Sequence, residues 1–199
     1  MSLYRRVLAL LAASLLLLTA CAPASSLDDV LSKYGMAGKN AEEIIEHLET
    51  MDPQDRPDDL LVSVQADQLV IQEQPDGTEH TMPLPQDKFY LSIAPYKEQT
   101  HDCFYHALTS CLGEITDTEF FVHIRDTETG ENYVNDHYRT NPNGFVGFWL
   151  PRDRNVEMKL STHADHGLES PKVQLSTASD APTCITDVKL NPIIYVEEK

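Results

Sequence analysis

Turn-forming residues divide the second half of the chain into short apolar runs, and this spacing restricts the folds open to it. Glu119–Arg125 alternates between two predicted faces, and the turn sequence Asn141–Gly144 precedes the apolar run Phe145–Leu150. Further short runs follow at Val156–Leu160, Val173–Leu175, Ile185–Leu190 and Ile193–Val196. Short strands at such spacing, with no helical period after Glu114, are typical of a β-sandwich. We therefore predict a β-sandwich-like C-terminal domain over residues 97–199.

The first half begins with two helical patterns and continues with strands. The second helix has Asn40 as its predicted N-cap, with Glu43 three residues on as the capping-box partner. Its apolar stripe consists of Ile44, Ile45, Leu48 and Met51. Alternating runs then predict strands within Leu60–Gln72, at Thr81–Leu84 and at Phe89–Ile93. The expected fold class is therefore α+β, in which a small helix-plus-antiparallel-sheet domain over residues 28–96 precedes the β-sandwich-like domain.

A secretion signal is expected at the start of the chain. Two arginines precede the apolar run Val7–Leu18, which is shorter than a typical membrane-spanning helix. The run leads into Leu18-Thr19-Ala20-Cys21, which resembles a bacterial lipobox. That resemblance implies a lipoprotein signal peptide over residues 1–20, a lipid on the sulfur of Cys21, and a tether over residues 21–27. The alternative is an ordinary secretory peptide with a cysteine near the cleavage site.

The chain is strongly acidic, with a formal net charge of −17. Loss of residues 1–20, which contain two arginines and no acidic residue, would change this charge to −19. Nucleic acid is therefore not an expected partner, because its phosphates are bound by lysine and arginine. The acidity favours solubility and attracts cations weakly.

Metal-ligating residue types are concentrated in one short stretch, Thr100–Cys111. His101, Cys103, His106 and Cys111 fall within eleven residues of a chain that has four cysteines in total. Thiolate and imidazole suit soft or borderline metals, above all Cu(I) and Zn²⁺. A helix would place Cys103 and His106 on one face, whereas a strand would align His101 with Cys103. In both geometries the stretch is a candidate metal site.

The cysteine count bears on redox state as well as on metal binding. If the first cysteine carries lipid, Cys103, Cys111 and Cys184 remain. Disulfides are the default in an oxidising compartment, and an odd count leaves one thiol unpaired or commits all three to another role. Cys184 is 73 residues from Cys111, so only the fold can bring it near. His163 and His166, spaced as H-x-x-H, are either further ligands or part of a polar loop.

Several blocks of the sequence carry a family resemblance. They are Phe89–Tyr96, Thr100–His106, Cys111–Glu114, Asn143–Phe145, Trp149–Arg152 and Thr183–Thr186. In this order, they resemble the CueP-type periplasmic copper-binding proteins of bacteria. The resemblance implies Cu(I) binding in the cell envelope, a part in copper resistance, and copper delivery to periplasmic copper enzymes such as copper,zinc superoxide dismutase. It also implies Cys103, Cys111 and Cys184 as metal-handling residues, with His101 and His106 as helpers.

Alternatives to this assignment remain open. If Cys103–Cys111 or Cys111–Cys184 is a disulfide, the chain could instead be a disulfide-stabilised envelope lipoprotein that acts as an interaction module. An intermediate case is a disulfide that forms only when no metal is bound. A site of three cysteines and one histidine would also suit Zn²⁺. An enzyme is not predicted, because the chain has neither a glycine-flanked nucleophile turn nor a C-x-x-C motif. Homodimer assembly is left open.

Overall fold

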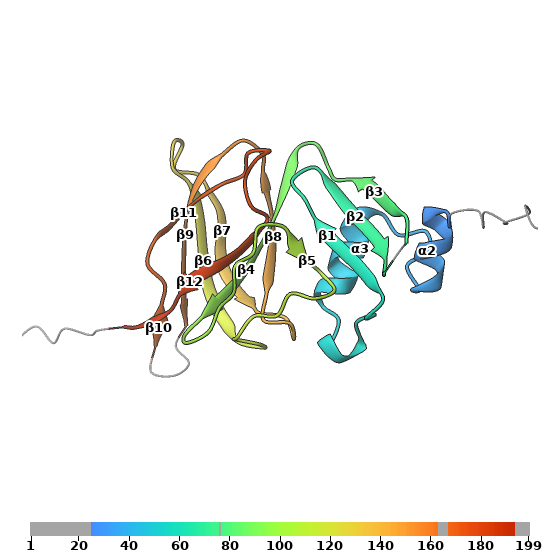
Figure 1. The fold of residues 1–199 in the computed structure, drawn as a ribbon. Helices are drawn as coiled ribbons and strands as arrows, with labels where there is room; N and C mark the ends of the chain where they lie inside the picture. Colours follow the sequence, from blue (N-terminus) through green and yellow to red (C-terminus); the bar gives the residue numbers. More distant parts are fainter. Residues whose placement is uncertain (1–24, 76, 163–166, 194–199) are drawn as a thin grey trace, which may run out of the picture.

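The computed structural model describes residues 25–75, 77–162 and 167–193 (Figure 1). The predicted signal peptide, Cys21, His163 and His166 lie outside these residues. The described helices are α2 (Leu27–Lys33) and α3 (Ala41–Glu49), with a 3-10 turn at Pro53–Asp55. The described strands are β1 (Leu60–Val64), β2 (Gln68–Glu73), β3 (Glu79–Pro83), β4 (Lys88–Tyr96), β5 (His106–Ala107), β6 (Glu119–Asp126), β7 (Asn132–Arg139), β8 (Val146–Pro151), β9 (Asn155–Thr162), β10 (Leu168–Glu169), β11 (Val173–Ser176), β12 (Cys184–Lys189) and β13 (Asn191–Pro192). No helix within the described ranges is long and apolar enough to cross a membrane.

Helix α3 begins where its sequence predicts. The Asn40 side chain accepts a hydrogen bond from the Glu43 N–H at 2.9 Å, and the Glu43 carboxylate accepts one from the Asn40 N–H at 2.8 Å. This capping box gives partners to N–H groups that the first helical turn leaves unpaired, and an N-cap contributes about 1 kcal/mol. The apolar stripe of α3 is buried, and the helix ends with Glu49 inside the protein.

The strands form three sheets. The N-terminal sheet has the order β3-β2-β1-β5, the middle sheet has the order β12-β4-β8, and the C-terminal sheet has the order β13-β10-β9-β6-β7, with β11 also paired to β9. Side chains of the middle and C-terminal sheets share one apolar core, and α3 shares a second core with the N-terminal sheet. Figure 1 shows β4 and β8 of the middle sheet between the N-terminal sheet and the C-terminal sheet. The predicted α+β class, with few helices and many antiparallel strands, is confirmed.

Strand β4 lies in a different sheet from the one its sequence suggested. We expected it to complete the N-terminal sheet, but it pairs with β8 antiparallel and with β12 parallel. Phe89, Leu91 and Ile93 enter the core shared with the C-terminal sheet, whereas Tyr90 and Ser92 contact Glu49 at the end of α3. Both faces of β4 are therefore covered, which explains why all but its terminal residues are buried.

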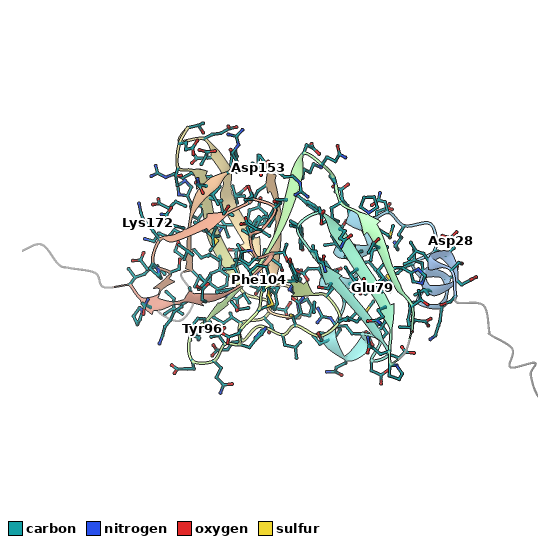
Figure 2. The ribbon with its side chains drawn as sticks, turned by 45° about the horizontal axis from the view of Figure 1, so that its top comes forward. Asp28, Glu79, Tyr96, Phe104, Asp153 and Lys172 are labelled. Carbon is teal, nitrogen blue, oxygen red and sulfur yellow. A yellow bond between two sulfur atoms is a disulfide. The ribbon has the colours of Figure 1, made fainter. Side chains whose placement is uncertain are left out.

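A two-residue strand from the second half of the chain completes the N-terminal sheet. In β5, His106 lies opposite Val64 of β1. The Thr183 hydroxyl accepts a hydrogen bond from the His106 N–H at 3.0 Å and donates one to the Val64 carbonyl. Figure 2 shows Phe104, which lies just before β5, near the middle of the molecule. Segments far apart in the sequence therefore meet beside the loop that carries the candidate ligands.

Candidate metal centre

The four predicted ligands of the Thr100–Cys111 stretch belong to the segment of the chain that connects β4 to β6. The Phe104 carbonyl accepts hydrogen bonds from the N–H groups of Thr183 and Cys184, at 2.9 and 3.1 Å. The Thr186 hydroxyl donates to the His101 carbonyl at 2.6 Å. The segment that leads into β12 and the strand itself therefore fix the backbone of this loop. His101 is placed by such a long-range contact, whereas the Cys111 backbone is held by a local turn in which its N–H donates to the Ala107 carbonyl at 2.9 Å.

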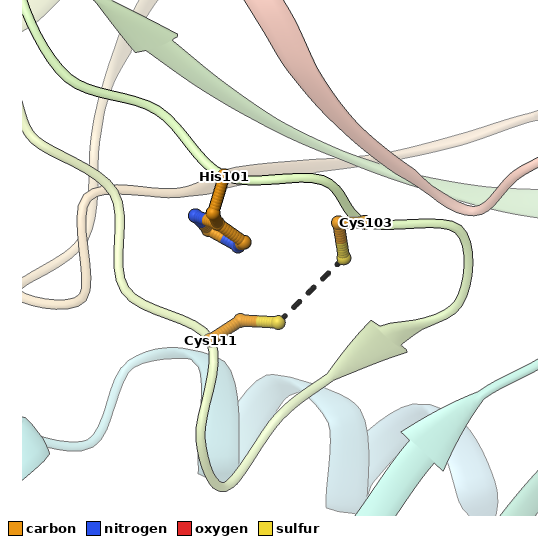
Figure 3. Close-up of side chains that lie close together, drawn as sticks. All are labelled: His101, Cys103 and Cys111. Carbon is orange, nitrogen blue, oxygen red and sulfur yellow. Dashed lines mark hydrogen bonds between the residues drawn. The ribbon is translucent and has the colours of Figure 1, made fainter.

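Two of the three cysteines form a disulfide, Cys103–Cys184, with their Cα atoms 5.6 Å apart. The two pairings considered from the sequence, Cys103–Cys111 and Cys111–Cys184, are therefore wrong for this structure. The reason is that β12 runs parallel to β4 and its first residue, Cys184, donates its N–H to the carbonyl of Phe104, the residue after Cys103. Cys111 is a free thiol, and its Sγ lies 3.7 Å from the Cys103 Sγ (Figure 3).

The fold brings the five predicted ligands into two overlapping groups. One consists of His101, Cys103 and Cys111, whose side chains point toward one another in Figure 3, and the other consists of His106, Cys111 and Cys184. Within each group, donor atoms lie within 4.8 Å of one another. His101 is exposed, whereas His106 and Cys184 are buried. Cys111 belongs to both groups, so its sulfur has candidate ligands on two sides: the exposed His101 and the buried His106 and Cys184.

His106 is completely buried and is paired with a carboxylate from α3. Its Nε2 lies 2.8 Å from Oε2 of Glu49. The other ring nitrogen, Nδ1, is buried and makes no hydrogen bond of regular geometry among the described residues. Because Nε2 is paired with Glu49, Nδ1 is the ring nitrogen that can share a metal ion with the sulfurs of Cys111 and Cys184.

Glu49, His106 and Cys111 form a chain of interacting charges. Burial lowers the pKa of His106, but the Glu49 carboxylate and the Cys111 thiolate outweigh burial and raise this pKa to about 9. Burial raises the pKa of Cys111, but the hydrogen bond and positive charge of His106 lower it below its usual value. Burial also opposes ionisation of Glu49, and His106 holds the pKa of that carboxyl below its usual range. The thiolate of Cys111, the form of cysteine that binds metals, is therefore more stable than that of an ordinary cysteine.

Sequence reasoning missed two residues of this centre. Glu49 lies four residues after Ile45, on the buried face of α3, and a carboxylate at such a position indicates a buried partner. Arg56 donates from Nη1 to the Cys111 carbonyl at 2.8 Å. Arg56 follows the short 3-10 turn, and no sequence pattern marked its contact with the loop.

Comparisons with known proteins identify the family of this chain. A family model described as "Periplasmic copper-binding protein CueP" matches residues 43–189, which include all five candidate ligands. A solved structure, "Crystal Structure of S.CueP", has 34% sequence identity and a TM-score of 0.75, and the match covers 84% of this chain and 99% of that chain. No curated protein matches the sequence. Because the family model matches well over half of the chain, this protein belongs to the CueP family of periplasmic copper-binding proteins.

Proposed function

We propose that this protein binds Cu(I) with Cys111 as the central ligand. The observation that carries the proposal is the position of the free Cys111 sulfur, which belongs to both groups of donors. Cu(I) is selected by soft ligands, and thiolate is the softest donor present. The buried Nδ1 of His106, which lacks a regular hydrogen bond, fits a second ligand. Cys103 and Cys184 add two more sulfurs when their disulfide is reduced, and His101 offers an imidazole at the surface.

Zn²⁺ is the second candidate, because the disulfide changes the set of donors. With Cys103 and Cys184 joined, the free donors are the Cys111 thiolate and the imidazoles of His101 and His106. One sulfur with two nitrogens suits Zn²⁺, whereas three thiolates suit Cu(I). We infer that the reduced protein is the Cu(I)-selective form.

Competition between the two metals tests the proposal. The fully reduced protein, loaded with Zn²⁺ and titrated with Cu(I) under anaerobic conditions, should release its zinc as copper binds. A thiol count before and after the titration should show the cysteines protected by copper. Zinc that stays bound against an equimolar amount of Cu(I) would remove the copper assignment. A repeat with the disulfide intact is the matched control and should show a weaker preference for copper.

The proposed role is that of a carrier in copper resistance, without catalysis. The donor groups reach the surface at His101, so a bound ion would lie close to a docked recipient. A periplasmic copper enzyme such as copper,zinc superoxide dismutase is the recipient that the family resemblance suggests. Transfer by direct ligand exchange suits a metal that is held by thiolates.

We further propose that a lipid on Cys21 anchors the protein to a membrane surface. The support is the Leu18-Thr19-Ala20-Cys21 sequence after an apolar run. Metabolic labelling with a fatty acid should tag the wild-type protein but not the Cys21→Ser variant. An unlabelled wild-type protein would exclude the anchor and leave an ordinary secretory peptide.

A further inference from the structure

We propose that Glu49 is a positioning residue of the metal centre: it holds Nε2 of His106, so that Nδ1 is the ring nitrogen that meets a metal on Cys111. This inference rests on the proposed function and deepens it. All ligands predicted from the sequence lie between residues 101 and 184, whereas Glu49 comes from helix α3 near the start of the chain. The N-terminal part would therefore shape the copper site without contacting the metal.

The Glu49 carboxylate is itself firmly held. Its Oε1 accepts hydrogen bonds from the hydroxyls of Ser92 at 2.5 Å and Tyr90 at 3.2 Å. Its Oε2 accepts from the Asn143 amide at 3.1 Å and lies 2.8 Å from Nε2 of His106. Four donors converge on two oxygens of a residue that is 3% exposed. An ionised carboxylate, which only accepts hydrogen bonds, satisfies all four, so its rotation away from His106 would leave buried donors unpaired.

The His106 ring is restricted on its other sides as well. The ring of Phe145 packs against it, with the centroids 4.4 Å apart. Its backbone N–H is bonded to the Thr183 hydroxyl. A histidine that binds a metal generally donates its second N–H to a carboxylate, a backbone carbonyl or a water, which fixes the tautomer and the ring orientation. With the proton kept on Nε2 by Glu49, Nδ1 is the nitrogen that gives up its proton and offers its lone pair when a metal binds.

A double-mutant cycle on Cu(I) affinity tests the inference. Glu49→Ala should lower the affinity about 10- to 100-fold, as expected for loss of the partner behind a metal ligand. In a His106→Asn background the same substitution should change the affinity by no more than about twofold, because no imidazole is left to orient. Equal losses in the two backgrounds would overturn the inference. Glu46→Gln, which removes an exposed carboxylate from the same helix, is the matched control and should retain the wild-type affinity.

Nitrogen-15 NMR of the wild-type protein tests the same point even if Glu49→Ala does not fold. In the metal-free protein, the His106 Nε2–H should exchange slowly with solvent. Addition of Cu(I) should shift the Nδ1 signal and leave the proton on Nε2, and the opposite pattern would overturn the inference. Cys111→Ser separates the two proposals: if it keeps full Cu(I) binding, the proposed function fails, whereas if it loses binding while Glu49→Ala does not, only the role of Glu49 fails.

Discussion

Cys111→Ser is expected to lower the Cu(I) affinity by at least about 100-fold. This loss exceeds the one expected when a residue that only hydrogen-bonds to a metal ligand is removed. Cys111 is the sulfur shared by both donor groups, and it remains free when Cys103 and Cys184 are joined. A serine hydroxyl has a similar size, but it is a hard donor and stays protonated at neutral pH, so it is a poor ligand for Cu(I). Competition against a chromogenic Cu(I) chelator measures the change.

Two controls accompany the Cys111→Ser measurement. Ser110→Ala alters the neighbouring exposed residue and should keep the wild-type affinity. The wild-type affinity itself should fall as pH decreases, because protons then compete with the metal for the thiolate and the imidazole. Wild-type affinity in the Cys111→Ser variant would show that Cys111 is not a ligand.

Removal of the Cys103–Cys184 disulfide is expected to lower the free energy of unfolding by about 4 kcal/mol, given the size of the loop that it closes. The two cysteines are 81 residues apart, so the crosslink restricts a large part of the unfolded chain. The double variant Cys103→Ala with Cys184→Ala, unfolded in urea without reductant, should show this loss as an earlier midpoint. The m-value shows whether the unfolded ensemble has also become more expanded.

The reduced wild-type protein is the control for the disulfide measurement. A reductant should lower the wild-type unfolding free energy to nearly that of the double variant and should leave the double variant unchanged. If the wild-type stability did not respond to reductant, the disulfide would not be a stabilising crosslink in solution.

Features that are satisfied within a few residues could be predicted from the sequence. The capping box of Asn40 and Glu43 and the apolar stripe of α3 are local, and both are found in the structure. The predicted alternation along β6 is found in the structure: Phe120, Val122 and Ile124 are buried and the residues between them are not, because a strand with one covered face repeats every two residues. The chemistry of the cysteine and histidine stretch also indicated four of the five residues that the fold gathers into the two donor groups.

Features that depend on distant segments could not be predicted in the same way. A run such as Phe89–Ile93 predicts a strand but not its sheet, because the covering of both faces is decided by α3 and the C-terminal sheet. The partner of Cys103 was decided by the parallel pairing of β12 with β4, across more than eighty residues. The contact between Glu49 and His106 joins two segments that are 57 residues apart, and the local pattern of neither segment predicts the other as its partner.

The pairing of β5 with β1 limits how far this protein can be shortened. A truncated chain that starts at residue 97 would keep every cysteine and histidine of the candidate centre. It would lack the β1 edge that fixes His106, and also Glu49, which engages the same imidazole. An engineered copper carrier derived from this scaffold would therefore need α3 and the N-terminal sheet as well as the sulfur-bearing loop.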